Sequence, residues 1–292
     1  MVKFATVILV ILLLTSCIAP PTTSRSLAPA QYKLYLPIIN SSPNPKRGIN
    51  LACGSYEQQA KEVAALGVAW LWNWGLNPPL FPNIESVPTI WNASTIGQPL
   101  GGNSQWLLGF NEPDGGEQAN MTPEAAARAW RKLEATYPDR LLTSPQVVHP
   151  GTWLEDWRAA YIAEYGQPPR IDALAIHTYW GKTTAAYSAQ VQSYVDLAKQ
   201  WGISEVWVTE WALAHQLDRT LQETTAEMRK YLAYLDAEPM VTRYAPWTNR
   251  VECMGDAYGF RYDGPFDTPL FNFDGSISEL GKAYRDAQRL AP

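Results

Sequence analysis

Two glutamates stand directly after strongly apolar segments of the chain. Residues 106–110 are followed by Asn111 and Glu112, and residues 206–209 are followed by Glu210. A carboxylate is costly to bury, so a glutamate at the end of a buried strand needs a structural partner or a chemical task. Two carboxyl groups about 5–5.5 Å apart can hydrolyse a glycosidic bond, one as nucleophile and one as acid/base. For each glutamate alone, an ion pair or a helix cap is the alternative.

Short apolar segments alternate with helical patterns from residue 46 onward, which predicts β-α units and a parallel sheet. The predicted fold class is α/β, a (β/α)8 TIM barrel of eight strands, with some short or missing helices. The strand ends of such a barrel meet at one mouth, which would bring Glu112 and Glu210 together. An open doubly wound sheet is the alternative, although the first strand lacks the glycine-rich turn of a dinucleotide site. The predicted strands are 47–52, 69–74, 87–91, 106–111, 141–145, 173–179, 206–210 and 242–246.

Several helix ends carry recognisable signals. Three hydroxyl residues have Gln or Glu three positions later, which predicts capping boxes. Two glycines fit the left-handed position after a helix, and a Thr-Pro pair fits a helix start. Prolines at 78, 79, 82 and 99 predict short or missing helices after the second and third strands. The signals are Ser55 with Gln58, Thr152 with Glu155, Thr220 with Glu223, Gly67, Gly166, and Thr122 with Pro123.

Five sequence blocks, in order, resemble glycoside hydrolase family 128, whose members share the so-called glycosyl hydrolase catalytic core. The resemblance covers residues 47 to 250. It implies a (β/α)8 barrel that cleaves β-1,3-glucans with retention of configuration. The blocks are residues 70–74 (WLWNW), 108–114 (LGFNEPD) with 118–123 (QANMTP), 176–179 (IHTY), 207–211 (WVTEW) and 241–247 (VTRYAPW).

The resemblance also assigns roles to residues. Glu112 is expected to be the acid/base and Glu210 the nucleophile of a double displacement. Asn111 is expected to bind the sugar 2-hydroxyl, and a turn-forming role before Pro113 is its alternative. The eighth block has Pro246 where the family often has an aromatic residue. The expected substrate-binding residues are Asn111, His177, Tyr179, Trp247, Asn73 and Trp74.

Some of these assignments have open alternatives. Tyr179 is expected to orient the nucleophile by hydrogen bonding. His177 is expected to line the cleft, with a buried core histidine as the equal alternative. On the second strand, Trp72, Asn73 and Trp74 cannot all point inward, because strand side chains alternate between two faces.

The N-terminus resembles a bacterial lipoprotein signal. Lys3 and the apolar run 5–14 precede Thr-Ser-Cys, and residues 14–17 (LTSC) resemble a lipobox, so Cys17 is expected to carry lipid. An ordinary signal peptide is the alternative. We therefore divide the chain into a signal peptide at 1–17, a Pro/Ser/Thr-rich linker at 18–45 and a catalytic domain at 46–292. The chain is expected to be exported, as a cell-surface lipoprotein or a secreted protein.

Composition limits the partners. The net charge is −5 with mixed signs, which argues against nucleic acid. The three histidines lack metal-binding spacing, so no metal and no cofactor are expected. The 13 Trp and 15 Tyr suit the stacking of sugar rings, although core packing explains most of them. A polysaccharide or oligosaccharide substrate, a monomer, and membrane contact only through the lipid are expected.

The two remaining cysteines, Cys53 and Cys253, follow the first and the eighth predicted strands. These strands are neighbours in a closed barrel, and export favours oxidation, so a disulfide is predicted. Two buried thiols are the alternative.

Three functions follow in order of preference. The first is an endo-acting β-1,3-glucanase, and the second is a retaining glycosidase on another β-glycan. The third is a surface lipoprotein that binds glycan without hydrolysis, which would not require a carboxylate pair.

Overall fold

The computed structural model describes residues 43–287 except 150, 180–182, 214–219 and 252–268. All of these residues belong to one compact unit, Leu36–Pro292. The predicted signal peptide, nearly all of the linker, Cys17 and Cys253 lie outside the described residues, so those expectations stay predictions. No helix in the described part combines the length and apolar character needed to cross a bilayer.

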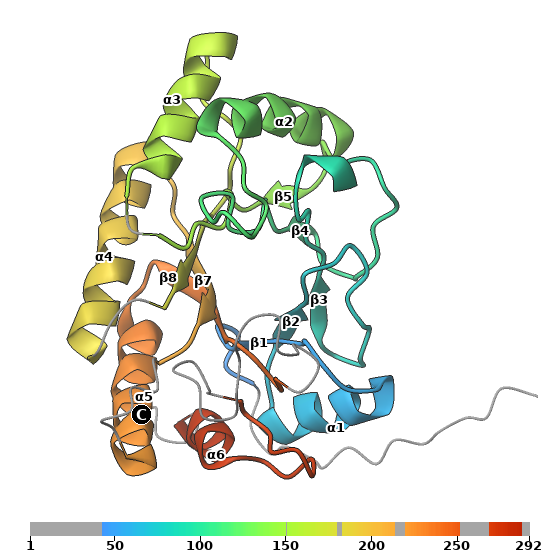
Figure 1. The fold of residues 1–292 in the computed structure, drawn as a ribbon, viewed down its shortest axis with the longest axis vertical. Helices are drawn as coiled ribbons and strands as arrows, with labels where there is room; N and C mark the ends of the chain where they lie inside the picture. Colours follow the sequence, from blue (N-terminus) through green and yellow to red (C-terminus); the bar gives the residue numbers. More distant parts are fainter. Residues whose placement is uncertain (1–42, 150, 180–182, 214–219, 252–268, 288–292) are drawn as a thin grey trace, which may run out of the picture. The chain divides into compact units, whose positions relative to one another are not determined.

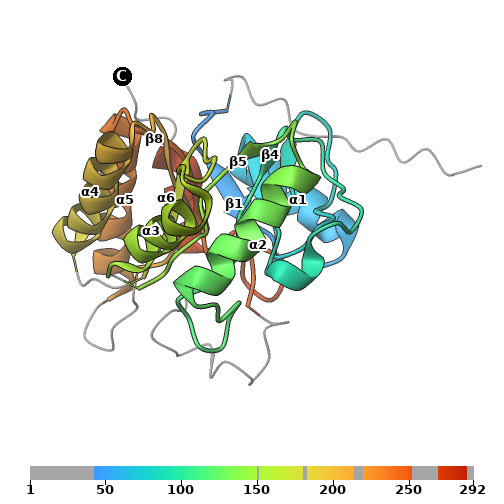
Figure 2. The same ribbon diagram turned by 90° about the horizontal axis from the view of Figure 1, so that it is seen from above.

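The described elements alternate between strands and helices, and the helices lie outside the strands in both views (Figures 1 and 2). The strands are β1 (Gly48–Asn50), β2 (Trp70–Trp72), β3 (Glu85–Val87), β4 (Trp106–Leu107), β5 (Leu141–Leu142), β6 (Leu174–Thr178), β7 (Val206–Trp211) and β8 (Val241–Pro246). The helices are α1 (Tyr56–Leu66), α2 (Pro123–Thr136), α3 (Trp153–Tyr165), α4 (Thr184–Trp201), α5 (Leu221–Ala237), α6 (Glu279–Asp286) and the short 3-10 helix η1 (Ala93–Thr95).

Most of the predicted helix signals are confirmed. Ser55 and Thr220 each form a complete capping box, and Thr122 caps α2 with Pro123 in its first turn. Gly67 and Gly166 end α1 and α3 in the left-handed region, with φ of 68° and 72°. These local signals explain where α1, α2 and α5 begin and where α1 and α3 end.

The capping box predicted at Thr152 is wrong. Its backbone is not extended (ψ 10°), and its side chain makes no capping hydrogen bond. The hydroxyl instead donates to Asp156 at 2.8 Å. The helix α3 forms without this cap.

The prediction of a closed (β/α)8 TIM barrel is also wrong. Each of the eight predicted segments overlaps a strand, β3 only at Val87, but the strands form three separate parallel sheets, β1-β2-β3, β4-β5 and β6-β7-β8. Among the described residues, the strand pairing between these sheets is limited to isolated bridges, such as Arg47 with Tyr244 and Thr89 with Leu108. Pro88 and Pro145 follow β3 and β5 closely, and a proline has no N–H to extend a ladder.

The two faces of the strands carry separate apolar clusters. One face packs against the helices and holds Leu71, Leu174 and Ile176 with most of the core. Alternation along the strands sends the intervening side chains to the other face. We call the apolar residues on that face the inner cluster. The inner cluster comprises Trp70, Trp72, Val87, Leu108, Ala173, Ala175, Trp207 and Ala245.

Gly48 makes room for the indole of Trp70 in the inner cluster. A Cβ added at Gly48 would lie 2.3 Å from a ring carbon of Trp70. That ring cannot move easily, because it donates to the Lys46 carbonyl at 3.1 Å and packs against Trp207 at 5.5 Å. We expect Gly48→Ala to cost about 1–3 kcal/mol of unfolding free energy or more through overpacking.

The urea midpoint of the purified domain measures this effect. Gly116→Ala is the matched control, since nothing lies within 4 Å of a Cβ at that position. The control should change stability by less than about 0.5 kcal/mol. Equal midpoints for the two variants would contradict the packing argument.

Candidate active site

Glu112 lies five residues beyond the end of β4, in an unusual backbone conformation. Its φ of 42° is in the left-handed region, which a non-glycine residue occupies only when its surroundings hold it there. The N–H of Glu112 donates to the carbonyl of Gln146 at 2.8 Å, and its carbonyl accepts from Gly115 at 2.9 Å. The backbone thus fixes the direction in which the Glu112 side chain leaves the chain.

Glu210 owes its direction to a bulge in β7. Trp207 belongs to the inner cluster, so strict alternation would turn Glu210 toward the helices. The pairing of β6 with β7 shifts by one residue at Thr209, and as a result His177 faces Glu210. Bulges of this kind re-aim side chains next to active sites.

His177 lies between the two glutamates. Its Nδ1 is 2.7 Å from Glu112 Oε1 and 3.4 Å from Glu210 Oε2. One ligand atom from each of the three residues lies within 4.8 Å of the other two. Glu112 is 9% exposed, Glu210 3% and His177 3%. The arrangement is a buried carboxylate pair bridged by an imidazole.

Burial and neighbouring charges determine the ionisation of the site. Burial raises the pKa of Glu210 to about 7; His177 opposes this rise, while the charge of Glu112 adds to it. Burial by itself lowers the pKa of His177, but Glu210 and Glu112 together outweigh it, so the pKa of His177 is raised. A proton is therefore retained near neutral pH within this group.

Two aromatic side chains donate hydrogen bonds to Glu210. The Tyr179 hydroxyl donates to Oε2, and the Trp74 indole N–H donates to Oε1 at 2.8 Å. Both contacts lower the pKa of Glu210 because they favour its charged form. They also fix the carboxylate in one orientation.

The structure separates the residues expected on the second strand. Trp72 is fully buried, and its indole N–H donates to the Thr209 carbonyl at 3.0 Å. Its ring lies 5.5 Å from that of Trp74 and 6.3 Å from that of His177. Asn73 instead accepts the N–H of Gly75 at 3.0 Å in a local turn. Trp72 and Trp74 thus lie beside Glu210 and His177, whereas Asn73 does not contact these residues.

Asn111 comes before Glu112 in the sequence, and Trp247 comes after Glu210. Asn111 precedes Glu112 and is 2% exposed; its amide N–H donates to Gln118 at 3.3 Å, and its Oδ1 has no partner among the described residues. Trp247 directly follows β8, and its ring meets that of Tyr179 edge-on at 6.4 Å. Trp247 is 6% exposed, so both side chains are largely covered by their neighbours.

Asp114 is a residue whose role the sequence did not reveal. Its carboxylate accepts the backbone N–H of Val148 at 3.1 Å and of His149 at 2.7 Å. It therefore ties the loop after Glu112 to the loop after β5. The available signal was its place after Pro113, since aspartate in turns often accepts backbone N–H groups.

Glu112, His177 and Glu210 also have the ligand types for a divalent cation. Their hydrogen bonds favour another use. The imidazole Nδ1 already bonds Glu112, and both oxygens of Glu210 accept from aromatic donors. These contacts suit a pair of carboxylates in which one transfers protons and the other forms a bond to a substrate.

The family follows from sequence comparison. The profile of the family described as glycosyl hydrolase catalytic core matches residues 48–284. The chain belongs to this family and is a glycoside hydrolase. None of the proteins of curated function matches it.

Solved structures of glycoside hydrolase family 128 are similar to the chain, which confirms the resemblance seen in the sequence. A curdlan-specific exo-β-1,3-glucanase from Blastomyces gilchristii is 25% identical, with a TM-score of 0.64 over 84% of this chain and 99% of that one. An endo-β-1,3-glucanase from Sorangium cellulosum is 27% identical, with a TM-score of 0.64 over 83% and 98%. An endo-β-1,3-glucanase from Amycolatopsis mediterranei, bound to laminaritriose, is 26% identical, with a TM-score of 0.65 over 83% and 99%.

The hydrogen bond from Tyr179 predicts a pH effect. If Glu210 acts in its ionised form, kcat/KM should fall as the pH drops through about 7, the raised pKa of this group. Tyr179→Phe removes a donor that lowers this pKa, so the acidic limb should move to higher pH. The measurement is the pH profile of kcat/KM for both proteins.

Tyr161→Phe is the control, because that hydroxyl donates to Glu134 between α2 and α3. It should leave the acidic limb in place. A limb that stays fixed or moves to lower pH in Tyr179→Phe would show that this hydrogen bond does not lower the pKa of Glu210.

Proposed function

We propose that the protein is a retaining endo-β-1,3-glucanase in which Glu210 is the nucleophile and Glu112 the acid/base. The observation that carries the proposal is the closeness of the two carboxylates, with one oxygen of Glu112 within 4.8 Å of one oxygen of Glu210. Retaining enzymes separate their carboxyl groups by about 5–5.5 Å, whereas inverting enzymes leave about 6.5–9.5 Å for a water molecule. The short separation supports direct attack by a carboxylate.

The reaction proceeds by two displacements. Glu210 attacks the anomeric carbon while Glu112 protonates the departing glycosidic oxygen, so one C–O bond forms as the other breaks. Glu112, now ionised, then takes a proton from water. That water attacks the anomeric carbon and releases Glu210, and the product keeps the β configuration.

The surrounding residues act on binding and charge. Asn111 binds the 2-hydroxyl, a contact that strengthens as the oxocarbenium-like transition state forms. Tyr179 and Trp74 hold Glu210 for attack through the hydrogen bonds they donate. His177 holds Glu112 at 2.7 Å. Trp247 offers an aromatic face to a neighbouring sugar ring.

The substrate class draws support from the relatives. All three are described as β-1,3-glucanases, and those from Sorangium and Amycolatopsis as endo-acting. Release of reducing ends from laminarin, curdlan, xylan and cellulose tests the proposal, with product sizes separating endo from exo action. Turnover only of xylan or cellulose would point to another β-glycan, and binding without turnover to a glycan-binding protein.

We also propose that the protein is exported and anchored through lipid on Cys17, with Cys53 and Cys253 joined as a disulfide. The signal-like residues 1–17 and the oxidising destination support this. Mass spectrometry of the exported protein should find a lipidated N-terminal Cys17. Thiol titration of the denatured, unreduced catalytic domain should find no free thiol, and two free thiols would defeat the pairing.

A further inference from the structure

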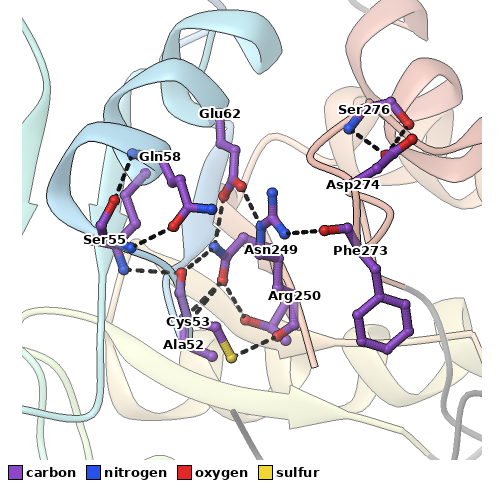
Figure 3. Close-up of polar contacts among 12 residues, drawn as sticks. Ala52, Cys53, Ser55, Gln58, Glu62, Asn249, Arg250, Phe273, Asp274 and Ser276 are labelled. Atoms are coloured by element: carbon purple, nitrogen blue, oxygen red, sulfur yellow. Dashed lines mark hydrogen bonds and ion pairs between the residues drawn. The ribbon is translucent and has the colours of Figure 1, made fainter. Parts of the chain in front are cut away.

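A buried polar cluster joins helix α1 to the segment that follows β8. Glu62 of α1 is 3% exposed, and Arg250 is 4% exposed. The guanidinium Nε of Arg250 donates to one oxygen of Glu62, and the amide of Asn249 donates to the other at 2.8 Å (Figure 3). The carboxylate on this helix is therefore bonded through both oxygens to residues 187 and 188 positions further along the chain.

Asn249 extends the cluster to the chain just past β1. Its Oδ1 accepts the N–H of Ala52 at 2.8 Å, and its Nδ2 donates to the carbonyl of Cys53 at 2.9 Å (Figure 3). One residue earlier, the Thr248 hydroxyl donates to the carbonyl of Asn50 at 2.9 Å. The stretch after β8 is thereby held by side chains at three successive positions.

A cluster of this kind is expensive for stability alone. Burying a carboxylate and a guanidinium costs solvation, and apolar residues of similar volume often serve a fold as well. What a buried ion pair does provide is a defined geometry, because each partner must sit where the other can satisfy it. A buried charge pair at this place therefore calls for a role in addition to stability.

The residue placed by this cluster is Trp247. On one side its backbone N–H donates to the carbonyl of Trp211, the last residue of β7, at 2.9 Å. On the other side, one and two residues later, Thr248 and Asn249 are tied to the β1 end. The ring in between meets Tyr179, which donates to Glu210.

We propose that Glu62, Asn249 and Arg250 are positioning residues that hold the indole of Trp247 as a platform for a glucose ring of the bound glucan. The inference rests on the proposed function for the identity of the ligand. The cluster does not touch the reacting atoms, so it acts on binding through Trp247 and not on the bond-breaking steps.

An ion pair between a buried arginine and a partly buried aspartate provides a control. Arg47 is fully buried and bonds Asp236 at 2.6 Å. Arg47 precedes β1 and Asp236 lies in the last turn of α5, so this pair is at the opposite end of the strands from Glu210. Glu62→Gln and Asp236→Asn each leave a buried arginine without its carboxylate partner, and both should lower the melting temperature.

The kinetic readout separates the two variants. With laminarihexaose, Glu62→Gln should raise KM about five- to tenfold and leave kcat within about twofold, which is the size of an aromatic contact. Asp236→Asn should leave KM unchanged. In a Trp247→Ala background the further effect of Glu62→Gln on KM should vanish, because both act on one contact. If Glu62→Gln does not fold, Arg250→Lys takes its place, since it keeps the charge but loses the guanidinium fork.

A readout without substrate keeps the two proposals distinguishable. Hydrogen exchange at residues 247–249 should be about tenfold faster or more in Glu62→Gln, and unchanged in Asp236→Asn. The positioning role would be overturned by equal exchange rates in the two variants. It would also be overturned if Glu62→Gln raised KM further in the Trp247→Ala background, or if it lowered kcat by the same factor by which it raised KM. Absence of β-1,3-glucan turnover by the wild type would instead refute the proposed function, and the exchange experiment would still decide the positioning.

Discussion

Glu210→Gln should lower kcat on laminarin by at least about 10³-fold, because the variant has no carboxylate to form the covalent intermediate. The amide has nearly the same size and can still accept from Tyr179 or Trp74, so the geometry of the site should survive. The measurement is steady-state release of reducing ends at the pH optimum. Activity within a few-fold of wild type in a folded variant would remove Glu210 from the mechanism.

The stability of this variant is a check on the same assignment. Burial raises the pKa of Glu210 from 4.5 to about 7, so in the wild type the folded state binds more protons than the unfolded state between those values. Unfolding free energy from this group therefore falls as the pH rises through that window. The glutamine variant has no ionisable group at this position, so its unfolding free energy does not fall with pH for this reason. Its melting temperature relative to wild type should be higher at pH 8 than at pH 4.

Glu112→Gln should lower kcat on laminarin by about 10²–10⁴-fold, the usual worth of a general acid and base. The defect should depend on the leaving group. An aryl β-glucoside with an acidic phenol needs little protonation, so the covalent intermediate should form and then accumulate, which gives a burst of phenol. Added azide, a nucleophile that needs no general base, should restore turnover of this substrate.

The control for this prediction is Glu117→Gln, an exposed glutamate in the same loop. It should leave both substrates unaffected. If Glu112→Gln loses equal activity on laminarin and on the aryl glucoside, and azide does nothing, Glu112 does not transfer protons in the reaction.

Much of this site could be predicted from sequence because its signals are local. Each glutamate follows an apolar strand, and strand alternation required Asn73 and Trp74 to face opposite ways. The contact of Trp74 with Glu210, and the local turn at Asn73, agree with that rule. Helix ends marked by a capping residue or by a glycine were predictable for the same reason.

The features that escaped prediction depend on pairing between distant segments. Closure of the sheet failed because single prolines such as Pro88 and Pro145 interrupt ladders that apolar composition alone suggests. The bulge at Thr209 breaks the very alternation used to assign faces, and it is this break that turns Glu210 inward. The bond between Glu62 and Arg250 has no sequence signature at all, since nothing local relates a helix position to a loop 188 residues away.

The stereochemistry of the first product tests the central claim most directly. Proton NMR of laminari-oligosaccharide hydrolysis, recorded before mutarotation, identifies the anomer released by the enzyme. Two displacements through Glu210 predict that the β-anomer appears first and the α-anomer only later, by mutarotation. An initial α-anomer would mean a single displacement by water, and Glu210 would then be a general base and not the nucleophile.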